Sequence, residues 1–120
     1  MDRAESSHPY DLEDRTLRFA KAVFAFVRTL PASIANIEIS KQLVRSAGSV
    51  GANYIEATES LGKKDFLMKV KISRREAKEC RYWLELVYNG PNEACTQEKL
   101  INESVQLMKI FGAIIRNRQS

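Results

Sequence analysis

Proline and glycine are scarce in this sequence of 120 residues, which has three prolines and five glycines. The prolines are Pro9, Pro31 and Pro91, and the long stretches between them contain no residue that would break a helix. No apolar run approaches the roughly 20 residues that a transmembrane helix needs. The segment MDRAESSHPYDLEDR is polar and partly acidic, unlike a secretory signal. These features predict a helical, cytoplasmic protein with no membrane partner.

Histidine and cysteine are equally rare. The only histidine, His8, lies in residues 1–10, which we expect to be flexible. Catalytic triads built on histidine and the Glu-x-x-His pairs of di-iron bundles are therefore excluded. Cys80 and Cys95 have neither metal-type nor redox-type spacing, and reduced thiols are expected. No glycine-rich phosphate loop follows a strand. We therefore expect no enzymatic activity, no cofactor and no metal.

Hydrophobic periodicity is helical throughout one domain, residues 11–118. Helices are predicted at about residues 11–30, 36–61, 64–88 and 96–118. The third has the most regular pattern, in which apolar or small residues alternate by four and three: Phe66, Val70, Ser73, Ala77, Cys80, Leu84 and Val87. Such a seven-residue repeat is typical of left-handed helix packing. The prediction is an all-α protein, an antiparallel up-down-up-down four-helix bundle.

Two glycines interrupt the second predicted helix, although each costs about 1 kcal/mol relative to alanine. Gly48 and Gly51 share a face with Val44 and Ile55, beside the face that carries the large apolar residues. Small residues on a second apolar face let another backbone approach closely. That backbone belongs either to a neighbouring helix of the same chain or to another subunit.

Asn53 and Glu56 lie one turn apart on a polar stripe of the same helix. The pair could fix register by hydrogen bonding, within the bundle or between subunits, or it could contact a ligand. A carboxylate at an interface needs a partner, and an arginine of the third helix is the expected one.

Basic charge is concentrated in residues 63–89, which carry 8 basic and 4 acidic side chains, an excess equal to the net charge of +4 of the whole chain. Most of these cations fall on one side of the third helix, with Arg75 nearby: Lys64, Lys71, Arg74, Lys78 and Arg81. Such a row can neutralise successive phosphates of a nucleic acid without reading base identity. The alternative is a solvated face on which Glu76, Glu79 and Glu85 pair with some of the cations.

Two segments resemble a known bacterial family. SVGANYIEA, Ser49 to Ala57, is similar to the S-[IV]-x-x-N-x-x-E-G signature of the four-helix-bundle proteins encoded in 23S rRNA intervening sequences, with Ala57 where many relatives have glycine. KKDFLMKVKISRREAKECRYWLEL, Lys63 to Leu86, resembles the family's third helix, and the likeness runs from about Asp11 to Arg118. The resemblance implies a homopentameric bundle. The similar accessory protein of diversity-generating retroelements works with a reverse transcriptase and nucleic acid.

For most relatives no function is established, so two hypotheses remain. The first is a non-enzymatic, homo-oligomeric accessory protein that binds nucleic acid, structured RNA rather than DNA, through the basic face of the third helix. The alternative is an assembly scaffold that uses the same face to bind an acidic partner protein.

Overall fold

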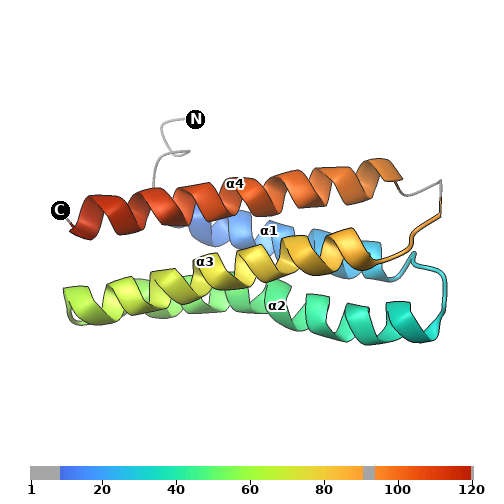
Figure 1. Ribbon diagram of the computed structural model, residues 1–120. Helices are drawn as coiled ribbons and strands as arrows, with labels where there is room; N and C mark the ends of the chain where they lie inside the picture. The colour runs from blue at the N-terminus through green and yellow to red at the C-terminus, as the bar shows by residue number, and fades with distance from the viewer. Residues whose placement is uncertain (1–8, 91–93, 120) are drawn as a thin grey trace.

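The computed structural model describes residues 9–90 and 94–119, which form four helices (Figure 1). They are α1 (Pro9–Val27), α2 (Ile34–Thr58), α3 (Lys63–Leu86) and α4 (Ala94–Gln119). The described residues contain no strand. The all-α prediction is therefore confirmed.

The helices form a ring in which each contacts the helices before and after it in the chain, and α4 closes the ring against α1. Consecutive helices run in opposite directions (Figure 1). Contact is most extensive between α2 and α3 and between α3 and α4, and weakest between α1 and α4. The two sides of α3 are thus bordered by different helices, α2 on one side and α4 on the other.

The helix bounds differ from the predicted ones at several ends. Helix α1 begins at Pro9, inside the segment that was expected to be flexible; the rest of that segment, residues 1–8, lies outside the described residues. Helix α1 ends at Val27, because the Thr29 N–H bonds back three residues to the Phe26 carbonyl at 2.9 Å and tightens the last turn before Pro31. Helix α4 begins at Ala94, so the prediction that it starts at Thr96 was wrong.

Both ends of α2 were also predicted wrongly. It begins at Ile34 because the Ser33 hydroxyl accepts from the Asn36 N–H at 3.0 Å and caps the first turn. It ends at Thr58, which leaves Leu61 fully exposed. Gly62 does not terminate α2 in a left-handed conformation; it has extended dihedral angles and stands at the N-cap of α3.

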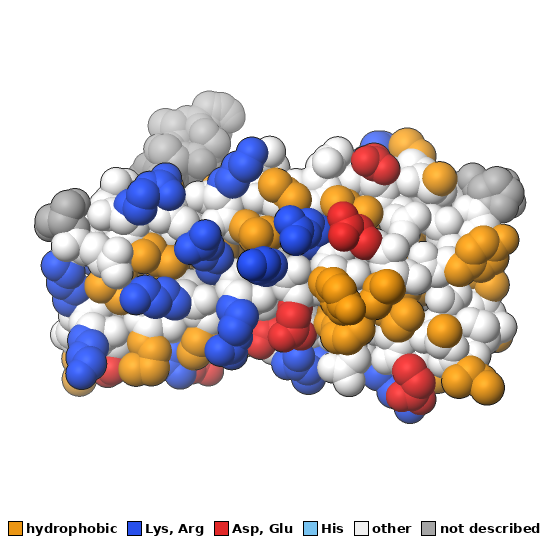
Figure 2. Space-filling view, viewed as in Figure 1, with side chains coloured by type: hydrophobic (Ala, Val, Ile, Leu, Met, Phe, Trp, Pro, Cys, Tyr) orange, Lys and Arg blue, Asp and Glu red, His pale blue; other side chains and the backbone are white. Residues whose placement is uncertain are grey.

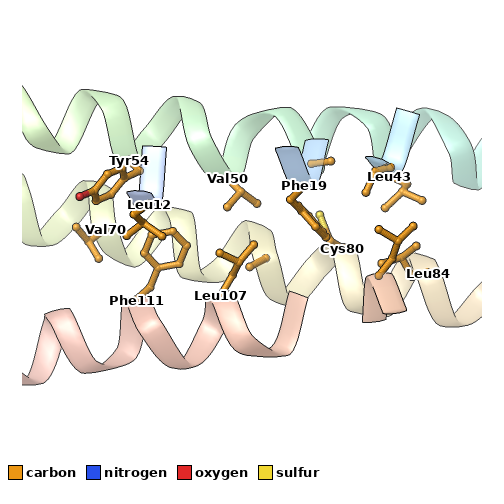
Figure 3. Close-up of a cluster of buried hydrophobic side chains, with 14 of the residues drawn as sticks. Leu12, Phe19, Leu43, Val50, Tyr54, Val70, Cys80, Leu84, Leu107 and Phe111 are labelled. Carbon is orange, nitrogen blue, oxygen red and sulfur yellow. The ribbon is translucent and has the colours of Figure 1, made fainter. Parts of the chain in front are cut away.

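The core is a single cluster of apolar side chains from all four helices (Figure 3). The third-helix repeat supplies it as predicted, since Val70, Ala77, Cys80 and Leu84 are wholly inaccessible to solvent. Ser73, on the same seam, is equally buried, and its hydroxyl donates to the Val50 carbonyl of α2 at 2.9 Å. A buried hydroxyl that is satisfied in this way joins α2 to α3 without the cost of an unpaired polar group.

A buried asparagine closes one end of the bundle. The Asn36 amide donates to the carbonyls of Pro31, at 2.9 Å, and Tyr88, at 2.7 Å, and its oxygen accepts from the Tyr88 N–H at 3.1 Å. The start of α2 is thereby fixed to the chain that leaves α3. Nothing in the local sequence indicated this role, because the partners lie 52 residues apart.

The two glycines of α2 have different surroundings. A Cβ atom at Gly51 would lie 2.7 Å from the Thr16 Oγ1 atom of α1, closer than non-bonded atoms tolerate. A Cβ atom at Gly48 would meet nothing within 4 Å, and Gly48 is exposed. Gly51 therefore serves close packing within the chain, whereas the bundle gives no reason for Gly48.

We predict opposite effects for alanine at these two positions. Gly51→Ala should lower the free energy of unfolding by about 1 kcal/mol, because overpacking costs about 1–3 kcal/mol and the better helix propensity returns about 1 kcal/mol. Within a single subunit, Gly48→Ala should raise the free energy of unfolding by about 0.5–1 kcal/mol, because nothing in the chain meets the added methyl group. Urea denaturation at one protein concentration measures both changes, and stabilisation by Gly51→Ala would contradict the Thr16 contact.

The two cysteines should differ in reactivity. Cys80 is buried, and desolvation, reinforced by Glu76 and Glu79, raises the pKa of its thiol to about 12, whereas Cys95 is exposed. A thiol-reactive dye should therefore label Cys95 in the native protein and reach Cys80 only on unfolding. Raising the pH from about 7 to 9 should leave native Cys80 protonated but ionise it in the unfolded chain, where its pKa is about 8.5, so the contribution of this thiol to stability falls. Labelling of the native Cys95→Ser variant followed by mass spectrometry tests the reactivity of Cys80, and rapid modification of Cys80 would contradict the prediction that this thiol is protected.

Candidate nucleic-acid interface

The basic residues predicted on α3 form a row along the side that borders α4. Lys64, Lys71, Arg74 and Lys78 are exposed, and Arg81 is half-buried. The Arg81 Nε atom is fully buried without a hydrogen-bond partner, so part of this guanidinium group is covered by the bundle. From Lys71 to Arg81 the row spans ~15 Å of helix.

Helix α4 adds a second arginine to this row at Gly112. From the position that a Cβ atom would occupy at Gly112, the Arg116 Nη1 atom is 3.6 Å away and the Arg74 Cζ atom is 3.9 Å away. Two guanidinium groups from two helices therefore meet above one glycine, and Lys109 is exposed on the same helix. Figure 2 shows Lys and Arg side chains gathered over the adjoining parts of α3 and α4.

Sequence reasoning missed the contribution of α4. The available signal was an isolated glycine one turn before an arginine in the fourth helix. Its meaning depends on the alignment of α4 with α3, which a single-helix pattern does not give. We call the combined surface the basic groove and define it by the residues that line it: Lys71, Arg74, Lys78 and Arg81 of α3 with Lys109 and Arg116 of α4.

The acidic residues of α3 do not neutralise the groove. Glu76 and Glu79 point to α2, where Arg45 lies between them, with Nη1 3.7 Å from Glu76 Oε2 and Nη2 3.1 Å from Glu79 Oε1. Among the described residues, no carboxylate oxygen lies within 4.0 Å of a side-chain nitrogen in this set: Lys64, Lys71, Arg74, Lys78 and Arg81. Of the expected pairings on α3, only that of Glu76 with Arg75 is present among the described residues, and both Glu76 and Glu79 also contact Arg45 of α2.

Two further arginines near the groove are already in contact with other groups. The Arg75 Nη2 atom lies 3.9 Å from Glu76 Oε2, so this predicted member of the row stands beside a carboxylate. The Arg118 guanidinium lies 4.4 Å from the centre of the Phe66 ring, a cation–π contact that joins the end of α4 to the start of α3. Arg75 thus has a carboxylate neighbour, whereas the Arg118 guanidinium is engaged by an aromatic ring.

Asn53 and Glu56 face the α2–α3 side, away from the groove. The Glu56 Oε1 atom lies 2.7 Å from Lys69 Nζ, so the prediction of an arginine partner was wrong, although the partner does belong to α3. Both side chains are partly exposed, and such a pair contributes at most about 1 kcal/mol. The Asn53 amide donates to the Ser49 carbonyl of its own helix at 2.9 Å. Both side chains thus have a partner within the chain, Lys69 for Glu56 and the Ser49 carbonyl for Asn53.

The predicted apolar face of α2 lies on a different side of the helix from Asn53 and Glu56, and it borders α1. Gly51 packs on α1, Val44 is half-buried, and Gly48 and Ile55 are exposed, with 47% of Ile55 accessible. Helix α1 presents exposed Leu17 and Phe24, seven residues apart. We call this surface the α1–α2 apolar face and define it by its partly or fully exposed members: Leu17, Phe24, Val44, Gly48 and Ile55.

The described residues contain neither a metal-type cluster nor a membrane-spanning helix. No group of three or more His, Cys, Asp or Glu side chains within them is placed to hold a metal ion. No helix in residues 9–90 or 94–119 has the length and apolar character to cross a membrane.

These features define a small helical-bundle protein with a basic face shared by two helices. Residues 10–113 match the model of the 23S rRNA-intervening sequence protein family, and the chain belongs to this family. Its structure is similar to the crystal structure of a protein of unknown function from the S23 ribosomal protein family of Bacteroides thetaiotaomicron, with 32% sequence identity and a TM-score of 0.74. The match covers 86% of this chain and 96% of that one. No curated protein matches the sequence.

Proposed function

We propose that this protein is a non-enzymatic, cytoplasmic accessory protein that binds structured RNA through the basic groove. The observation that carries the proposal is a row of α3 cations that have no described carboxylate within 4.0 Å: Lys64, Lys71, Arg74, Lys78 and Arg81. A phosphate bound along this row would accept charge-assisted hydrogen bonds from the lysine and arginine side chains, and Arg116 of α4 lies beside Arg74 at Gly112.

The chemistry of the groove suits backbone recognition. Lysine and arginine bind phosphate oxygens and release counterions, which makes affinity depend steeply on salt. The groove residues include no Asn or Gln that could read a base edge in the usual bidentate way. RNA is favoured over DNA because the family takes its name from 23S rRNA.

The proposal assigns no catalytic role to the chain.

The groove residues should control RNA affinity. Neutralising four cations of α3 should abolish tight binding at about 50 mM salt, and it should reduce the dependence of log affinity on log salt by about one for each lost phosphate contact. The changes are Lys71→Gln, Arg74→Gln, Lys78→Gln and Arg81→Gln. Fluorescence anisotropy with a labelled RNA hairpin at about 50 and 200 mM salt measures both quantities.

A matched variant controls for net charge, since it also loses four exposed cations, but outside the groove: Lys21→Gln, Arg28→Gln, Lys41→Gln and Lys99→Gln. It should bind nearly as the unchanged protein does. Equal weakening by both variants would show that net charge, not the groove, binds RNA. If the unchanged protein fails to bind RNA at low salt but binds polyglutamate, the scaffold with an acidic protein partner takes the place of this proposal.

Assembly is the second part of the proposal: the α1–α2 apolar face joins copies of this chain into a homo-oligomer, a pentamer by the family resemblance. Five partly or fully exposed apolar or small residues on two adjacent helices leave hydrophobic surface in water, which association would bury. Gly48 then has a reason to be glycine, because a second subunit's backbone could approach there.

A charge on this face should dissociate the oligomer. Ile55→Glu would bury an unpaired carboxylate at the interface, at a cost of several kcal/mol, and should yield monomers in sedimentation velocity runs. Leu61→Glu, at a fully exposed position beyond the end of α2, is the control and should leave the mass unchanged. An unchanged mass for folded Ile55→Glu would place the interface elsewhere.

A further inference from the structure

An exposed aromatic ring continues the basic face toward the end of α3. Lys71, Arg75, Lys78 and Tyr82 follow one another at spacings of four, three and four, which places them on one side of the helix. Tyr82 is 56% exposed, so it contributes little to the core. Figure 2 shows hydrophobic side chains gathered beside the basic ones on this face.

The Tyr82 ring is held in place by its neighbour. Trp83 packs edge-on against it, with ring centres 5.0 Å apart, and the Trp83 Nε1–H donates to Glu79 Oε1 at 3.3 Å. The same oxygen accepts from the Ser46 hydroxyl at 3.0 Å and from Arg45 at 3.1 Å, so α2 fixes the support beneath the ring. A ring that is already ordered loses little entropy when a ligand covers it.

Cations in a row followed by a supported, exposed ring suit one form of nucleic acid. In a duplex the base faces are stacked inside, so a protein can reach phosphates, sugars and base edges but no free base face. In a single strand the phosphates can follow the cations while a base stacks on an aromatic side chain. We propose that the basic groove binds an unpaired segment of RNA and that Tyr82 stacks on one of its bases.

This inference rests on the proposed function and adds a strand type and a further contact residue. The closing experiment compares a labelled single-stranded oligoadenylate of about ten nucleotides with a blunt duplex of the same length. Tyr82→Ala should weaken binding of the single strand about tenfold and leave duplex binding unchanged, because one stacked base is lost. Tyr82→Phe keeps the ring and should bind as the unchanged protein does. Tyr88→Ala removes another exposed tyrosine, beyond the end of α3, and should also have no effect.

The single tryptophan provides a second readout. A base on Tyr82 lies close to Trp83, so the oligoadenylate should change tryptophan emission in the unchanged protein and much less in Tyr82→Ala. Circular dichroism should show the same helix content in all variants.

The outcomes separate the two proposals. If the unchanged protein binds neither RNA, the proposed function fails and this inference fails with it. If it binds RNA and Tyr82→Ala binds the single strand equally well, stacking is overturned while the groove proposal stands. Equal weakening on single strand and duplex would also overturn stacking, because the ring would then support the surface in general.

Discussion

The ion-pair cluster between α2 and α3 determines the charge of the rest of α3. Arg45 of α2 takes up both Glu76 and Glu79, and Glu79 also accepts from Ser46 and Trp83. With these carboxylates turned toward α2, Lys71, Arg74 and Lys78 on the other side of α3 have no described carboxylate within 4.0 Å. The ion-pair cluster that joins α2 to α3 thus also leaves a basic surface. Glu76 and Glu79 lie on the side that faces α2, so they do not neutralise the cations on the opposite side.

Packing against α4 then shapes this surface. Gly112 of α4 faces the side of α3 that carries Arg74. The position that a Cβ atom would occupy at Gly112 is 3.6 Å from Arg116 Nη1 and 3.9 Å from Arg74 Cζ. An alanine there would be in ordinary contact with both guanidinium groups, so the glycine makes room for them without being sterically required. The groove therefore depends more on the alignment of the two helices than on any one residue.

Periodicity within one helix was sufficient to predict the α3 seam, since Val70, Ala77 and Leu84 of the repeat are all wholly buried. It also placed the basic row on one side. It could not distinguish Gly48 from Gly51, because the difference is a contact with Thr16 of another helix. The partner of Glu56 and the role of Arg116 depend in the same way on interhelical register. The end of α2 was mispredicted for a local reason. A glycine such as Gly62 can end one helix in a left-handed conformation or cap the next helix in an extended one, and here Gly62 caps α3.

The order of helices in the ring separates the two proposed surfaces. The α1–α2 apolar face and the groove between α3 and α4 lie on opposite pairs of helices, and α1 does not contact α3. Association through the first surface would leave the second open in every subunit. Several weak phosphate-binding grooves carried on one oligomer would act at high effective concentration, so one RNA could be held far more tightly than one groove allows. A modest net charge of +4 for each chain is then enough for tight RNA binding, because assembly increases the number of grooves on one particle without changing the charge of each chain.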